Sequence, residues 1–279
     1  MTPDLLTAYQ SAQFGRASRL RIWLFFAQLL VAIPAAISVV VENGALLYWL
    51  ALAGALLAIA YWALQASYRR FREGAQVARR AGLIANGLGG SFSAAETREL
   101  RQKFAVTEGV ASGCLNPEYY ASELQPGYAR LAELVEESAF YTAHLQGKSS
   151  IVLRFIVVLF LAIFALIAFA GLPYAATDTM MVVIRVALAF LVFVLSTDVF
   201  GAMVGHKHAA AGARDIYMRL SRARAEGFRK NDVLLALSDY NAIIEAAPEV
   251  VPFIYRLSRG DLDQRWREYQ RDAARPESQ

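Results

Sequence analysis

Four runs of about 20 predominantly apolar residues dominate the sequence, at positions 22–41, 45–64, 155–176 and 180–200. A helix of that length crosses the hydrocarbon core of a bilayer, which is about 30 Å thick. Hydrophobic residues make up 57% of the chain and charged residues only 19%, a composition unlike that of ordinary soluble domains. The sequence therefore predicts an integral membrane protein whose four transmembrane helices form two hairpins.

The distribution of basic residues predicts the topology. The two short connections within the hairpins, residues 41–44 and 177–179, contain neither lysine nor arginine. All the basic residues except Arg185 lie on the other side of the apolar runs, and such residues are enriched in cytoplasmic segments. Both termini are therefore expected in the cytoplasm. The sequence pI of about 9.2 is explained by this topology rather than by nucleic-acid binding.

These features divide the chain into four segments. Residues 1–64 hold an N-terminal segment and the first hairpin, and residues 65–150 form a cytosolic helical insert. Residues 151–204 hold the second hairpin, and residues 205–279 form a cytosolic helical tail. Because the sequence shows neither an internal repeat nor the alternating pattern of strands, the predicted fold class is all-α.

Helix start and stop signals locate the elements of the insert. The run Gly87-Leu-Gly-Gly-Ser91 ends the helix that continues the second apolar run, and Ser93 with Glu96 forms a capping box for the next helix. Apolar residues then recur at helical spacing between Leu131 and Leu145. This spacing predicts a helix with one buried face that leads into the third apolar run.

Similar signals predict three helices in the tail. The first covers residues 209–225. Asn231 or Asp232 is expected to cap the second, which ends before Pro248, and Asp261 is expected to begin the capping motif of the third.

Two stretches carry a resemblance to a known family. In the insert, Tyr119-Tyr120 is followed by Glu137-Ser-Ala-Phe-Tyr-Thr-Ala-His-Leu145 just before the third apolar run. In these stretches and in its plan of two hairpins, the chain resembles the four-transmembrane, SMODS-associated pore-forming effectors. The elements that carry the resemblance in the tail are Tyr240-Asn241, Ala247-Pro248, Pro252, Ile254-Tyr255, Arg259, Leu262 and Trp266.

The resemblance implies a function in bacterial defence against phage. Members of that family accompany nucleotidyltransferases that make a nucleotide signal during phage infection, and they are understood to permeabilise the inner membrane on receiving it. For this chain the expectation is a nucleotide-gated channel or pore of the bacterial inner membrane, acting in abortive infection. Its signal would be a cyclic or linear oligonucleotide from a partner nucleotidyltransferase.

Arg185 is a permanent charge inside the fourth apolar run, near its outer end. On a helix it shares a face with Ala189, Val192 and Ser196. This strip is a candidate pore lining, because ionisable residues within the membrane commonly mark aqueous pathways. The alternative is that the long side chain only reaches the outer headgroups. Both interpretations are kept.

The first apolar run carries a comparable strip of candidate pore-lining residues, Gln28, Ala32, Ala35 and Glu42. Small residues between polar ends suit a narrow pore that can be gated. Small residues also let membrane helices pack closely, and packing is the preferred interpretation of Ala32 and Ala35. Packing is the only role given to Gly54 and its small neighbours in the second run.

The insert supplies candidate residues for binding the signal. Arg98 and Arg101 follow the glycine-rich turn at the start of a helix, where an anion could bind. Tyr119 and Tyr120 offer stacking surfaces, and Arg130 offers a phosphate partner. The competing interpretation is a flexible turn before a solvated basic helix, since the turn lacks both the Walker lysine and the Rossmann spacing.

We expect no catalytic site, metal site or cofactor. Cys114 is the single cysteine, which excludes an intramolecular disulfide and a multi-cysteine metal site. The run His206-Lys207-His208 is interpreted as a basic anchor for lipid headgroups, because residues two apart on a helix do not converge on one ion. Without a nucleophile elbow, a zinc-protease motif or an intramembrane carboxylate pair, a membrane enzyme is the least favoured interpretation.

The leading hypothesis is a channel that forms its pore as a homo-oligomer, with a tetramer preferred. Four spans with so little polar lining cannot enclose an aqueous pathway in a monomer. The alternative hypothesis is a non-conducting membrane scaffold whose basic cytosolic helices dock a partner or anionic lipid.

Overall fold

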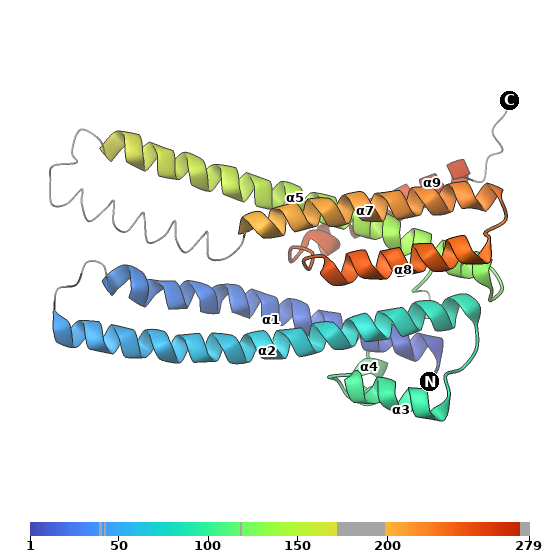
Figure 1. Ribbon diagram of the computed structural model, residues 1–279, viewed down its shortest axis with the longest axis horizontal. Coiled ribbons are helices and arrows are strands. Elements are labelled where there is room, and N and C mark those ends of the chain that lie inside the picture. Colours follow the sequence, from blue (N-terminus) through green and yellow to red (C-terminus); the bar gives the residue numbers. More distant parts are fainter. Residues whose placement is uncertain (39–40, 42, 118, 172–198, 274–279) are drawn as a thin grey trace. The chain divides into compact units, whose positions relative to one another are not determined.

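The structure, a computed structural model, describes residues 1–38, 41, 43–117, 119–171 and 199–273 (Figure 1). Of these residues 84% lie in helices and none in a strand, so the predicted all-α fold is confirmed. The helices are α1 (Pro3–Ser38), α2 (Gly44–Leu88), α3 (Ala94–Lys103), α4 (Glu108–Ser112), α5 (Tyr128–Gly171), α7 (Val199–Ala225), α8 (Lys230–Ala246) and α9 (Ile254–Ala273).

The described chain packs as two units. The helical unit contains Met1–Ser18, Arg69–Ser149 and the chain from Gly205 onward. The apolar unit contains Arg19–Tyr68 and the described residues of Ser150–Val204. Helices α1, α2, α5 and α7 contribute to both units, because each of them begins in one unit and ends in the other.

Among the described residues, three helices are long and apolar enough to cross a membrane. Helices α1, α2 and α5 each contain a stretch of the required length, and few or none of the residues in these stretches are buried. The outward side chains include large apolar ones such as Trp23, Trp62 and Phe169. Their exposure is consistent with a membrane protein, in which lipid would cover them. Nearly all of the fourth predicted span, 180–200, lies outside the described residues.

Helix α5 is the centre of the main core of the helical unit. The predicted periodic face is buried, with Leu131, Leu134 and Val135 fully so, but Ala132 and Ala139 on other sides of the helix are buried as well. Helix α5 is therefore surrounded rather than packed through one face, which its sequence pattern did not predict. Its core neighbours are Leu83 of α2, Ile216 and Leu220 of α7, and Val233, Ala236, Leu237 and Tyr240 of α8.

A second core cluster is built on the start of α1, for which the sequence predicted only an N-terminal segment. Leu6 and Tyr9 of α1 are buried there, together with alanines of α2 and Phe104, which follows α3. The rings of Tyr9 and Phe104 lie 4.4 Å apart between centroids. Small residues let α1 approach α2 closely, since a Cβ built on Gly82 would lie 3.7 Å from Leu6 Cβ.

Three of the predicted helix boundaries are confirmed. Helix α2 ends at Leu88, and Gly89 and Gly90 follow with φ of 71° and 109°, a region that favours glycine. The Ser93 hydroxyl accepts a hydrogen bond from the Glu96 amide at 3.1 Å and so caps α3. Helix α7 ends at Ala225, just before Gly227 with φ of 78°.

The predicted caps of the last two helices are wrong. Helix α8 starts after Arg229, with no side-chain cap, so neither Asn231 nor Asp232 caps it. Helix α9 starts at Ile254, seven residues before Asp261. Asp261 lies inside the helix and binds Lys148 instead, with 3.4 Å between Oδ2 and Nζ. An early start is favoured because it adds a buried turn that packs against α5 through Ile254.

The predicted headgroup anchor at His206 is also wrong. The His206 side chain is fully buried in the helical unit, where its Nδ1 is hydrogen-bonded to Gln146 Oε1. Lys207 and His208 are exposed, as the prediction requires, but His206 belongs to the protein interior.

Candidate functional site

A buried arginine stands out in the interior of the helical unit. Arg79 of α2 is only 5% exposed, and its Nε donates a hydrogen bond to Gln76 Oε1 at 2.8 Å. The Arg79 guanidinium lies over the ring of Tyr240, 5.1 Å from the centroid, at a distance typical of a cation–π contact. Its Nη2 is 3.8 Å from Glu245 Oε1, which makes an ion pair without a hydrogen bond.

The two terminal nitrogens of Arg79 have no hydrogen-bond partner among the described residues. Leaving a buried charged donor unpaired is unfavourable by several kcal/mol in order of magnitude, so interiors rarely contain one. Arg79 is therefore a buried group of the helical unit whose hydrogen-bonding capacity an anion would complete.

Tyr119 and Tyr120 lie beside this arginine in the loop before α5. Their rings contact each other edge to face, with centroids 4.8 Å apart, and Tyr120 packs against the main core. Burial raises the pKa of the Tyr119 hydroxyl, Tyr240 adds to the effect, and Arg79 opposes it. We refer to Arg79, Tyr119, Tyr120 and Tyr240 as the aromatic–arginine cluster.

The aromatic–arginine cluster is closed by a contact from α1. Gln10 Nε2 donates a hydrogen bond to the Tyr119 hydroxyl at 2.8 Å, which ties the loop to α1. The Oε1 atom of Gln10 is buried and has no partner among the described residues. Two polar groups with unused capacity therefore flank the tyrosine pair, namely Arg79 and Gln10.

Glu137 of α5 is a second ionisable group beside the same loop. Burial, opposed by the Ala121 amide and assisted by the carboxylates of Glu133 and Asp263, raises the pKa of Glu137 to about 7. That amide donates to Glu137 Oε2 at 3.2 Å. Protonation of Glu137 near pH 7 would therefore weaken one of the bonds that hold the loop.

The arginines predicted to bind the signal lie apart from the tyrosines or already have partners. Arg98 is exposed on α3, a helix that packs on the second core cluster rather than on the main one. Arg101, on the same helix, pairs with Glu108 at 3.0 Å. Arg130 donates to the backbone carbonyls of Asn86 and Leu124, so it holds the loop to α2.

A buried ionic network lies on another side of α5. Glu136 is fully buried and accepts hydrogen bonds from Arg224 Nη2 at 2.8 Å and from the Tyr269 hydroxyl at 2.7 Å. Arg224 Nη1 also donates to Glu133 at 3.0 Å. Burial raises the pKa of Glu136, and the bonds from Tyr269 and Arg224 lower it. This network joins α5, α7 and α9, and we interpret it as structural.

The candidate pore-lining residues are described only in part. Gln28 and Ala32 are half-buried in α1, and Ala35 lies in the same helix with its side chain outside the described structure. Where α1 passes α2, a Cβ built on Gly54 would lie 3.9 Å from Pro34 Cβ, in agreement with a packing role for Gly54. Glu42, Arg185, Ala189, Val192 and Ser196 lie outside the described residues.

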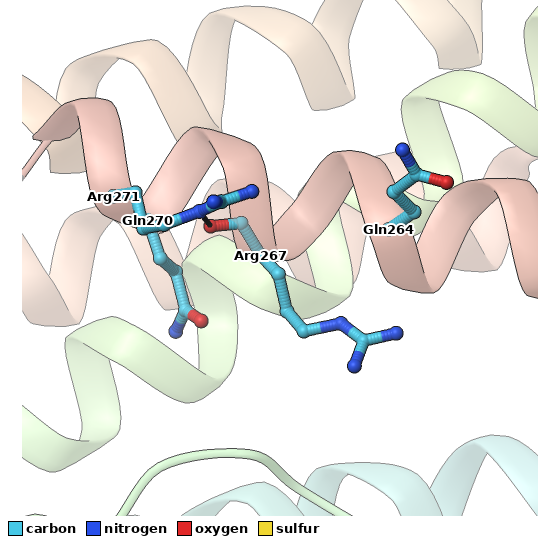
Figure 2. A pocket seen from close by; sticks show the side chains of 4 residues that line it. All are labelled: Gln264, Arg267, Gln270 and Arg271. Atoms are coloured by element: carbon cyan, nitrogen blue, oxygen red, sulfur yellow. Dashed lines mark hydrogen bonds between the residues drawn. The ribbon is translucent and has the colours of Figure 1, made fainter.

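A shallow hollow occurs along the C-terminal half of α9 (Figure 2). Its lining consists of Gln264, Arg267, Gln270 and Arg271, all from that one helix. Figure 2 shows Arg267 and Gln270 directed to the same side of the helix. The lining has amide and guanidinium donors but neither an acid nor a nucleophile, so it offers no acid–base chemistry.

Comparison with protein-family models, with curated proteins and with solved structures finds no significant match. Within the described residues, no group of three or more histidine, cysteine, aspartate or glutamate side chains could hold a metal ion.

Sequence reasoning missed Arg79 and Glu136, although helical spacing carried a signal for both. Arg79 falls among the small residues Ala75, Ala78 and Gly82 of α2, which are buried together. A charged residue on such a face has to find a partner inside the protein. Glu136 adjoins the apolar pair at 134 and 135 in the same way.

Proposed function

We propose that the protein is a nucleotide-gated channel of the bacterial inner membrane that acts as the pore-forming effector of an anti-phage abortive-infection system. Its closing segment and the approach to its second hairpin resemble the four-transmembrane, SMODS-associated effectors. The pore forms on the axis of a homo-oligomer, with a tetramer preferred, and the signal is a cyclic or linear oligonucleotide from a partner nucleotidyltransferase.

The observation that carries the proposal is the continuity of the long helices. Helices α1, α2 and α5 each supply both a membrane-length apolar stretch and part of the core of the helical unit. A ligand that repacks the helical unit therefore acts on the same helices that would line or surround the pore. Shifts and rotations of packed helices are an established way of transmitting such a change.

An oligomeric pore is favoured by the scarcity of polar residues in the apolar unit. Gln28 is the uncharged polar candidate of α1, and the side chains around it are apolar and exposed. Polar groups within a membrane face a bundle interior or a water-filled path. Repetition of Gln28 around an axis would place several amides on one path.

The aromatic–arginine cluster is the proposed site of the nucleotide signal. Tyrosine rings stack on bases, and a guanidinium binds phosphate through paired N–H groups. Because Tyr119 is held by Gln10, entry of the ligand requires the loop before α5 to move away from α1. The ligand then binds the open form of the loop more tightly than the closed form, which is the condition for shifting the equilibrium.

Ion flux from liposomes that contain the purified protein tests the channel. Flux should start when a cyclic or short linear oligonucleotide is added and should be absent with mononucleotides. Normal insertion without flux under any of these nucleotides would refute the channel and leave the membrane scaffold as the better description.

Two variants separate the candidate ligand sites. Tyr119→Ala should move the nucleotide dependence of flux to higher concentrations, by about tenfold for the loss of one stacking contact. Arg98→Gln, which changes an exposed charge of α3, should leave the dependence unchanged. The reverse result would place the ligand on α3 and contradict the cluster.

A further inference from the structure

The first turns of α9 expose apolar side chains to an unusual degree. Leu257 is 83% exposed and Phe253 is 59% exposed, and Tyr255 lies between them with half of its surface open. Phe253 directly precedes α9, and its carbonyl accepts a hydrogen bond from the Leu257 amide at 3.0 Å, so the two exposed residues meet at the first turn of the helix. The side of α9 with Ile254 and Leu262 is buried against α5.

The backbone holds Phe253 in a strained conformation. Its φ is 72°, in the left-handed region that bulky residues rarely adopt. Such strain persists where surrounding contacts impose it, and it is common at sites of function. Two backbone hydrogen bonds hold the chain around Phe253: the Ile254 amide donates to Val251 O at 3.3 Å, and the Leu257 amide donates to Phe253 O at 3.0 Å.

This surface lies close to the point where α5 leaves the helical unit. The Val251 amide donates to Ser149 Oγ at 3.2 Å, and Ser149 is the last residue that α5 contributes to the helical unit. Ile151, an exposed apolar residue, follows two positions later, which is about 3 Å along a helix. Val251 therefore lies within about one helical turn of the apolar stretch of α5.

Helix α7 also contacts the segment that precedes α9. A Cβ built on Gly205 would lie 2.9 Å from Pro248, so the two residues are in close contact. Gly205 is the residue at which α7 enters the helical unit. The segment that precedes α9 is thus tied to both helices at the residues where their apolar parts end.

Basic residues accompany the exposed apolar ones. The Arg256 guanidinium lies 5.8 Å from the centroid of the Phe253 ring, and Arg259 is exposed one turn further on. The nearest acidic residues of α9 already have other partners, since Asp261 binds Lys148 and Arg265, and Asp263 accepts a hydrogen bond from the Tyr141 hydroxyl at 2.6 Å. The ion pair of Asp263 with Arg259 is long, at 3.9 Å, and exposed. Aromatic and apolar side chains flanked by arginine are typical of segments that lie in a membrane interface.

We propose that the start of α9 binds the surface of the bilayer that α5 enters, with Phe253 and Leu257 among the headgroups and Arg256 and Arg259 on anionic lipid. Exposed apolar surface next to a transmembrane crossing is covered by lipid, and arginine near the surface attracts negative headgroups. The inference rests on the membrane location alone and is independent of the proposed channel.

Site-directed spin labelling of the full chain in lipid nanodiscs tests the anchor. Cys114→Ser first removes the single native thiol. A nitroxide is then attached at Leu257→Cys or, as the matched control, at Leu235→Cys of α8. Leu235 is 58% exposed and lies about 16 Å along α8 from the end that meets Pro248, so its label should remain in water.

The measurement compares collision of each label with oxygen, which concentrates in the bilayer, and with a water-soluble nickel chelate. The ratio of oxygen to nickel accessibility should be several-fold higher at Leu257 than at Leu235 in nanodiscs that contain phosphatidylglycerol. Arg256→Gln with Arg259→Gln should lower the Leu257 ratio towards the value in pure phosphatidylcholine. Equal ratios at the two sites would overturn the anchor. Low access to both reagents with dipolar broadening would also overturn it, because a second copy of the chain would then cover the surface.

Discussion

Removal of Arg224, the arginine partner of the buried Glu136, should destabilise the helical unit strongly. Arg224→Met keeps the aliphatic stem of the side chain but removes the guanidinium, which lies 5.5 Å from the centroid of the Phe228 ring. It removes both of the bonds from Arg224 to Glu136 and Glu133. Glu136, which has no exposed surface, keeps only its bond from the Tyr269 hydroxyl.

The expected loss follows from the burial of the carboxylate. Removing one partner of a buried ion pair typically lowers the free energy of unfolding by about 3–5 kcal/mol. Because Tyr269 still donates to Glu136, we expect a loss near the lower limit, about 3 kcal/mol. For a domain of about 150–250 residues this loss corresponds to a decrease in Tm of roughly 6–12 °C.

Arg219→Met is the matched control, since it removes the same type of residue from the same helix. Arg219 donates to Asp239 at 2.7 Å, but the two side chains are 36% and 40% exposed. An exposed pair contributes less than about 1 kcal/mol, so Tm should fall by less than about 4 °C. Thermal unfolding in detergent can be followed by circular dichroism at 222 nm, because the described residues are mostly helical. Equal decreases in the two variants would refute the argument from burial.

The pH dependence of the Arg224→Met loss gives a second test. Burial raises the pKa of Glu136 above its unfolded value, so the stability linked to its proton is present at low pH and is lost as the pH rises through the folded pKa. Arg224 opposes this rise, and the pKa should be higher still without it. The difference in Tm between wild type and Arg224→Met should therefore shrink as the pH is lowered towards about 5. A difference that grows at low pH would contradict the assignment to Glu136.

Glu137, Gly87 and Gln28 give further measurable expectations. Because the pKa of Glu137 is raised to about 7 from 4.5, wild type should lose at most about 3 kcal/mol of stability as the pH rises through that interval, and Glu137→Gln should remove this dependence. Gly87→Ala places a Cβ 2.8 Å from Leu131 Cα and should reduce stability by about 1–3 kcal/mol in urea unfolding, whereas Gly15→Ala, with open space, should be neutral or stabilising. Gln28→Leu should change single-channel conductance or ion selectivity without changing oligomer size; unaltered currents would place the pore on another face.

The parts of the fold that could be predicted depend on local chemistry. The first three apolar runs, the glycines after Leu88 and the Ser93 cap act through neighbours in the sequence, and the structure has them where the sequence predicted them. The start of α9 was misplaced because a good capping motif at Asp261 says only that a helix could begin there. The buried contact of Ile254 with α5 decides that it begins earlier.

The candidate site was less predictable because its contacts join distant parts of the chain. Arg79 meets Tyr240, and Tyr119 meets Gln10, across 161 and 109 positions. Sequence patterns indicate that a charge faces inward but do not identify its partner. Residue type alone points to the tyrosine pair, whereas Arg79 is one of many basic residues on the predicted cytoplasmic side, and nothing near it in the sequence names Tyr240 as its partner.

The buried charges of the helical unit help to fix the position of one long helix against another. Apolar side chains pack at several relative positions of two helices, whereas a charge pair such as Glu136 with Arg224 permits one, because any slip leaves a buried charge unpaired. Replacing both residues by apolar ones should therefore restore much of the stability lost in Arg224→Met, since no buried carboxylate is then left unpaired and Tyr269 keeps its side-chain hydrogen bond with Ser221. If the pair sets the position of α5 against α7, the double variant should nevertheless show an altered nucleotide dependence of flux. Restored stability with wild-type gating would assign the pair to folding alone and leave the aromatic–arginine cluster to hold the resting state.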